Sequence, residues 1–209
     1  MKLKKIASLA LAGIMAVSML AGCKDGTNQE EPGSSSSEVT TVSGAAEGLN
    51  SALLQNNDVI KFEDDAELDR DLEAYFSANP INGDHWKLST TMEWAADNTK
   101  LANYIGVTHT DYNNFKGLVE YKTDSTNFLE ARAVVGMFNS KVFTKADALK
   151  YVGNAIDNMD FATDVATSTN DGKEFVYSGK ASVIEVSSEK GAASVWVVVA
   201  VVDKDYTTI

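Results

Sequence analysis

The feature that most constrains the fold is the sequence SVWVVVAVVD near the C-terminus. Residues 195–202 are all apolar and most are valine, a β-branched residue that favours a strand. The run is too short to cross a membrane as a helix, which needs about 20 apolar residues. A strand without polar alternation is covered on both faces. We therefore predict a central strand of a sheet, with helices on one side.

Three further segments have a strand-like period or an ambiguous one. Residues 161–165 and 174–187 alternate between apolar and polar side chains. A turn sequence at 170–172 separates these two segments, and another at 189–191 separates the second from the valine-rich run. The sequence FKGLVEY at 115–121 is ambiguous and could add a fourth strand. We expect a C-terminal antiparallel meander of three to four strands.

The preceding part of the chain has a helical period. A short helix is expected around Leu49, and a second is expected to end before Pro80. The sequence TTME at 90–93 resembles a capping box and predicts a helix that ends at Gly106. Two more helices are expected at 125–139 and after Thr144. Helices followed by an antiparallel meander predict an α+β fold, as a single domain over residues 47–209.

The N-terminus has the layout of an export signal. Three lysines at positions 2, 4 and 5 precede an uncharged apolar run over 6–20. The sequence Leu20-Ala21-Gly22-Cys23 that follows is similar to a bacterial lipobox, and Cys23 is the chain's one cysteine. The resemblance implies that residues 1–22 are removed and that Cys23 carries a diacylglyceryl group. The alternatives are an ordinary secretory peptide and an uncleaved anchor helix.

Residues 23–46 are expected to form a disordered tether. They are rich in serine, glycine and acidic residues and contain almost no large apolar side chain. Beyond the signal segment, 30 acidic residues face 15 basic ones, because the segment takes three of the chain's 18 lysines and arginines. This charge disfavours binding to nucleic acid or to anionic lipid by the domain's own field. The predicted location is the extracytoplasmic face of the cell membrane, in the style of Gram-positive surface lipoproteins.

Aromatic and histidine residues in connecting segments are the candidate ligand-binding residues. Trp86 and Tyr112 lie near several asparagines, and flat rings beside amides and carboxylates suit sugar rings. The alternative for aromatics is packing in the core. His85 and His109 flank the same predicted helix and could share an acid–base or metal site, or could be ordinary loop histidines.

Several acidic residues are candidate cation ligands. Asp65, Asp69 and Glu73 share one face of a predicted helix at i, i+4 and i+8. The calcium-loop glycine and carbonyls are missing, so we interpret this face as solvated, and we interpret the pair Asp203 and Asp205 as turn acids. No metal site, cofactor or catalytic residue is predicted.

The predicted function is an envelope binding module. Motifs for a nucleophile elbow, a phosphate loop and a zinc protease are all missing, which favours binding over catalysis. A glycan or an envelope protein is the expected ligand, and the membrane is contacted through lipidated Cys23. The alternatives are a small envelope hydrolase, whose carboxylate or histidine site is assembled by the fold, and a structural partner of a larger membrane complex.

Overall fold

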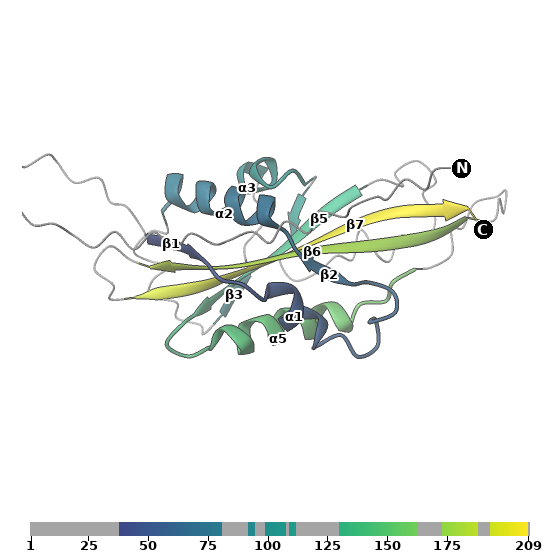
Figure 1. Cartoon of the computed structure of the whole chain (residues 1–209), viewed down its shortest axis with the longest axis horizontal. Coiled ribbons are helices and arrows are strands. Elements are labelled where there is room, and N and C mark those ends of the chain that lie inside the picture. The colour runs from purple at the N-terminus through teal and green to yellow at the C-terminus, as the bar shows by residue number, and fades with distance from the viewer. Residues whose placement is uncertain are drawn as a thin grey trace, which may run out of the picture. The chain divides into compact units, whose positions relative to one another are not determined.

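A long antiparallel hairpin forms the centre of the sheet. The computed structural model describes residues 38–80, 92–94, 99–107, 109–111, 130–162, 173–187 and 193–208 (Figure 1). Strands β6 (Lys173–Ser187) and β7 (Ser194–Thr208) pair along their whole length, and β5 (Glu130–Asn139) pairs with the other side of β7. The valine-rich run is therefore a central strand, as predicted.

Each outer side of this three-stranded centre is completed by two short strands. Along β6 these are β1 (Glu38–Thr41), antiparallel, and β2 (Phe62–Asp64), parallel. Along β5 these are β3 (Met92–Trp94), antiparallel, and β4 (His109–Asp111), parallel. The result is an antiparallel path β1-β6-β7-β5-β3, with β2 and β4 beside it. This sheet is more extensive than the meander of three to four strands that we expected.

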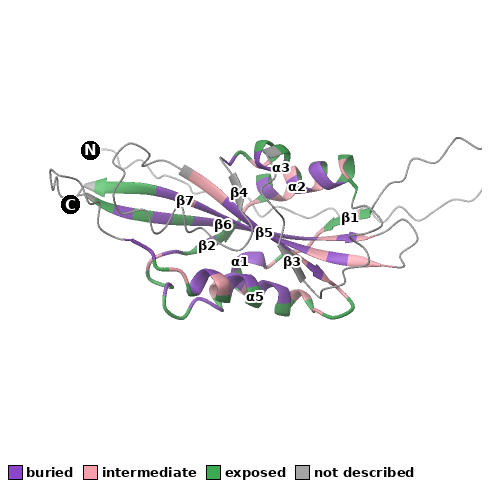
Figure 2. Ribbon diagram, turned by 180° about the vertical axis from the view of Figure 1, so that it is seen from behind, coloured by how far each residue is buried: buried purple, intermediate pink, exposed green. Residues whose placement is uncertain are grey.

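Helices cover both faces of the sheet. Helices α2 (Ala66–Ala78) and α3 (Thr99–Tyr104) lie on one face, and α1 (Ala45–Asn50) and α5 (Lys145–Asp157) lie on the other (Figure 1). Each pair packs over its own apolar cluster, and alternate residues of β7 enter the two clusters. Figure 2 shows burial along the middle of β6 and β7 and exposure toward the end of β7. The expectation of helices on one side only is therefore wrong.

Several helix boundaries follow from local sequence. Asp65 caps α2 by accepting hydrogen bonds from the backbone N–H groups of Glu67 and Leu68, and α2 ends just before Asn79 and Pro80. Helix α5 begins with a capping box between Thr144 and Asp147. Gly106, which follows α3, has a φ of 67°, a conformation that glycine adopts without strain. These boundaries confirm the helices predicted before Pro80 and after Thr144.

Three segments differ from the expectation. Residues 130–139, predicted as part of a helix, are β5, and residues 92–94, predicted as the start of a helix, are β3. Residues 38–46, assigned to a disordered tether, include β1 and the start of α1, because Val39 and two threonines make a β-branched strand that pairs with β6.

The α+β class is confirmed: the long strands of the sheet lie in the C-terminal half of the chain, and most of the helical residues precede them. Residues 115–121 lie outside the described part. Within the described ranges, no helix is long and apolar enough to cross a bilayer.

Close packing between α1 and α5 is made possible by Gly153. An added Cβ at this position would lie 2.7 Å from the Cβ of Ala52 and 2.8 Å from the backbone oxygen of Leu49. We expect Gly153→Ala to lower the free energy of unfolding by about 1–3 kcal/mol, the usual cost of overpacking a core. Urea unfolding monitored by circular dichroism measures this change. Asn154→Ala, at the exposed neighbouring position, is the control, and equal stability of the two variants would contradict the prediction.

Candidate functional site

A groove of about 400 Å³ lies on the α2/α3 face of the sheet. One wall is the first part of α2, the opposite wall is the end of α3 with the turn after it, and the floor is formed by β5, β6 and β7. The apolar lining consists of Leu68, Ile105, Val107, Ala131 and Val201, and the polar lining consists of Asp65, Glu67, Asp71, Asn103, Tyr104, Lys180 and Asp203. The floor itself is mixed, because Ala131 and Val201 are apolar whereas Lys180 and Asp203 are charged. A hollow that combines apolar side chains with convergent polar groups is typical of ligand sites.

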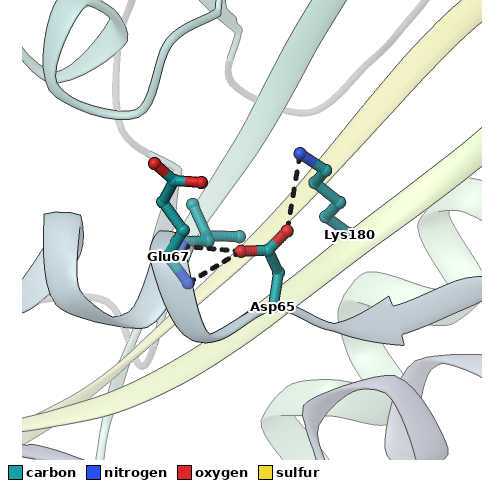
Figure 3. A network of polar contacts seen from close by, with 4 residues as sticks. Asp65, Glu67 and Lys180 are labelled. Atoms are coloured by element: carbon teal, nitrogen blue, oxygen red, sulfur yellow. Dashed lines mark hydrogen bonds and ion pairs between the residues drawn. The ribbon is translucent and has the colours of Figure 1, made fainter.

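Asp65 is held by contacts on both of its carboxylate oxygens. Oδ1 accepts hydrogen bonds of 2.9 Å from the backbone N–H groups of Glu67 and Leu68, and Oδ2 lies 3.4 Å from Nζ of Lys180 (Figure 3). The hydrogen bond from Leu68, supported by Glu67 and Lys180, lowers the pKa of Asp65. Asp65 is therefore a fixed negative charge in the wall of the groove.

Two more acids of α2 also contact the sheet. Asp69 accepts a hydrogen bond from the hydroxyl of Ser182 on β6, and Glu73 accepts one from the hydroxyl of Thr41 on β1. With Asp65 they form a carboxylate row at i, i+4 and i+8 that faces β6 and β1. The interpretation of this helix face as solvated is therefore wrong, because each carboxylate has its own partner on the sheet.

Burial perturbs two acids near the groove. Burial raises the pKa of Asp69, and the carboxylates of Asp64, Glu73 and Asp65 raise it further, against the hydrogen bond from Ser182. Burial also raises the pKa of Asp203, with a contribution from Asp65 and against the opposing effect of Lys180. The groove thus holds one carboxyl with a lowered pKa, Asp65, and one with a raised pKa, Asp203.

Tyr104 presents an aromatic ring at the groove. The residue is 40% exposed, and its ring packs edge to face on Tyr75 with centroids 5.4 Å apart. Its neighbour Asn103 is also exposed and lines the groove. The sequence predicts an aromatic ring beside amides and carboxylates at Trp86 and Tyr112, whereas the groove combines these groups at Tyr104 and Asn103.

Most of the residues predicted to form a site remain untested. Cys23, His85, Trp86 and Tyr112 lie outside the described residues. His109 is the first residue of β4, which pairs with β5 in parallel and places His109 opposite Arg132. We expected His109 in a connecting loop, but it lies on a strand.

Two groove residues that the sequence analysis missed had a detectable signal. Lys180 lies an even number of residues before Ile184 and Val186 on β6, so it is on the same face of the strand as these two residues, which are buried under α2. Asp203 likewise lies on the same face of β7 as Val199 and Val201. Its interpretation as a turn acid is therefore wrong. At these two positions the charged residue on the α2/α3 face of the sheet lies where the core opens to the groove.

Stability should increase as the pH falls from 7 toward the raised folded-state pKa values of Asp69 and Asp203. A folded-state pKa above the ordinary 3.8 of Asp69 and Asp203 means that the folded state binds protons first, so acidification through the raised pKa favours folding. Below 3.8 the trend reverses, because Asp65 and Asp157 have lowered pKa values and lose stabilisation when protonated. Thermal unfolding at a series of pH values measures both effects.

Substitution of Asp69 and Asp203 separates their contribution to the pH dependence of stability from the general loss of charge repulsion as the acidic chain is protonated. The double variant Asp69→Asn/Asp203→Asn should gain less stability than the wild type as the pH falls from 7 toward 3.8. Asp58→Asn is the control, because Asp58 is an exposed acid in the loop between α1 and β2. An unchanged pH profile in the double variant would refute this assignment.

No group of three or more His, Cys, Asp or Glu side chains is arranged to hold a metal ion in the part of the chain that the structure describes. No family model, curated protein or solved structure matches the chain. The function must therefore be inferred from the chemistry of the groove and from the N-terminal motif.

Proposed function

We propose that the chain is a lipid-anchored binding module on the extracytoplasmic face of a bacterial membrane, and that its groove binds a neutral or positively charged glycan. The lipobox-like sequence that ends at Cys23 supports the anchor. The observation that carries the binding proposal is the groove itself, with its exposed Tyr104 ring beside a mainly polar and charged lining.

The charge of the groove narrows the ligand class. Four carboxylates line it, those of Asp65, Glu67, Asp71 and Asp203, against the single ammonium group of Lys180. Anionic ligands would be repelled, whereas hydroxyl and amino groups donate hydrogen bonds that carboxylates accept. A glycan that contains free amino groups fits this lining best, and a neutral glycan fits next.

Tyr104 supplies the stacking surface in this proposal. Removing an aromatic contact costs about 0.5–1.5 kcal/mol beyond area burial, so Tyr104→Ala should weaken glycan binding roughly three- to tenfold. Isothermal titration of residues 34–209 with chitosan oligosaccharides and neutral peptidoglycan fragments measures the affinity.

Tyr151→Ala is a matched control for that variant. Tyr151 is 43% exposed and also packs edge to face on another ring, that of Phe138, but it lies on α5 on the other face of the sheet. Equal loss of affinity in the two variants, or no loss in either, would contradict the placement of the ligand in the groove.

A small hydrolase is the second candidate, and one observation favours it. The groove contains two carboxyls whose pKa values are shifted in opposite directions, a pattern that separates a general acid from a base. Asp203, with its raised pKa, would be the acid. Asp65, however, already accepts two backbone hydrogen bonds and faces Lys180, which leaves it poorly placed to activate a water molecule.

Product analysis separates the two candidates. For a binding module, the oligosaccharides should be recovered intact after long incubation, and Asp203→Asn should change affinity only. If the oligosaccharides are cleaved and Asp203→Asn lowers the rate by at least a hundredfold at equal affinity, the hydrolase replaces the binding module.

A further inference from the structure

We propose that the end of the sheet where β1 begins faces the membrane, and that an apolar and basic surface there, the turn surface, rests on the bilayer. The turn surface comprises Lys141, Val142, Phe143, Lys145, Lys150 and Tyr151, from the turn after β5 and the first turns of α5. This inference rests on the lipid anchor of the proposed function.

The strand register places the turn surface at the same end of the sheet as the start of β1. Glu38 pairs with Ser187, and Ser187 pairs with Ser194. The backbone N–H of Ser140 donates a 3.2 Å hydrogen bond to the carbonyl of Ser194, so the chain leaves β5 beside that row. In Figure 1, β1 and the turn between β5 and α5 both lie toward the left.

A direct contact joins the turn surface to the segment after β1. Nζ of Lys145 donates a 2.8 Å hydrogen bond to the backbone oxygen of Ser43, which is two residues beyond β1. The segment that links β1 to α1 therefore lies beside the start of α5.

The length of chain before β1 keeps this end close to the membrane. Fifteen residue steps separate Cys23 from Glu38, and fully extended they reach at most about 50 Å. A flexible chain of that length has an average span of only about 20 Å. With its first strand at Glu38, the domain has a shorter tether than the sequence predicted, so its near end meets the bilayer surface often.

The side chains of the turn surface suit the interface of an anionic membrane. Val142 is 57% exposed and Tyr151 43% exposed, and the ring of Phe143 packs against that of Tyr151. Valine and tyrosine at such exposure can enter the headgroup region, where tyrosine is enriched. Two exposed lysines, Lys141 and Lys150, flank them, and lysines are attracted to anionic headgroups.

The charge of this surface differs from that of the rest of the domain. The whole chain has a formal charge of −12, yet residues 141–151 contain three lysines and a single acid. That acid, Asp147, has its carboxylate engaged in the capping box with Thr144. An acidic domain held near an anionic bilayer would be expected to present its basic surface to it.

The same orientation directs the groove away from the membrane. Lys180, on the groove floor, lies seven residues along β6 from Ser187, which is about 23 Å at strand spacing. A glycan in the layer above the membrane would then reach the groove without passing the bilayer.

Collisional quenching tests the orientation. The lipidated mature chain, residues 23–209, with Val142→Cys carries one reactive thiol, because the Cys23 sulfur is blocked by its lipid. This thiol is labelled with a fluorescent maleimide, and the protein is reconstituted in vesicles of phosphatidylglycerol and phosphatidylcholine that contain nitroxide-headgroup lipid. We expect quenching at position 142 to be at least threefold stronger than at position 54 in the matched variant Leu54→Cys.

Leu54 is the control because it is exposed and lies at the other end of α5. It is 78% exposed, and the backbone N–H groups that follow it, those of Gln55 and Asn56, donate to the carboxylate of Asp157 at the end of α5. Both substitutions are at solvent-exposed apolar positions and should leave the fold intact. Replacing phosphatidylglycerol with phosphatidylcholine should reduce the difference between the two positions, as should Lys141→Gln/Lys150→Gln.

The outcomes distinguish a failure of the orientation from a failure of the anchor. Vesicle-bound protein with equal quenching at both positions, or with stronger quenching at 54, overturns the orientation and leaves the anchor standing. Protein that fails to float with the vesicles, or that floats equally well as a Cys23→Ser variant, overturns the anchor and the orientation together. Stronger quenching at 142 that weakens without anionic lipid supports both.

Discussion

The pairing of β6 with β7 is the interaction on which the rest of the domain depends. It runs unbroken from Lys173 opposite Thr208 to Ser187 opposite Ser194, and its middle is buried on both faces. Alternate valines of β7 enter two separate apolar clusters, one under α2 and α3 and one over α1 and α5. The hairpin therefore joins two cores, and among the described residues β5 is the other long strand that contributes to both.

The groove is a consequence of how α2 contacts that hairpin. Leu68 and Leu72 bury one side of the helix, while the adjacent carboxylate row is held against β6 and β1 by Lys180, Ser182 and Thr41. Unlike leucines, carboxylates need polar partners when they are desolvated, so this side of the helix lies over polar groups of the sheet. Where the row begins, at Asp65, the core gives way to the polar lining that we assign to ligand binding.

Local sequence predicted the elements whose signals are themselves local. The cap of α5 at Thr144, the end of α2 before Pro80 and the strand over 195–202 follow from capping, proline geometry and β-branching. The error at 130–139 has a physical cause. A strand buried on both faces has no period of two, so Val135 and Phe138 also fit a helical spacing, and only the pairing with β7 decides between them.

The sequence by itself determined the α+β class and the central position of the valine strand, because these depend on short-range composition and spacing. It also carries the lipobox-like sequence at Cys23 on which the proposed anchor rests. Only the tertiary structure decided that helices cover both faces, that Asp65, Asp69 and Glu73 face the sheet, and that Asp203 and Tyr104 line one groove. The physical reason is chain distance. Ser182 and Asp69 are 113 residues apart, and no local preference specifies a contact between side chains so far apart in the sequence.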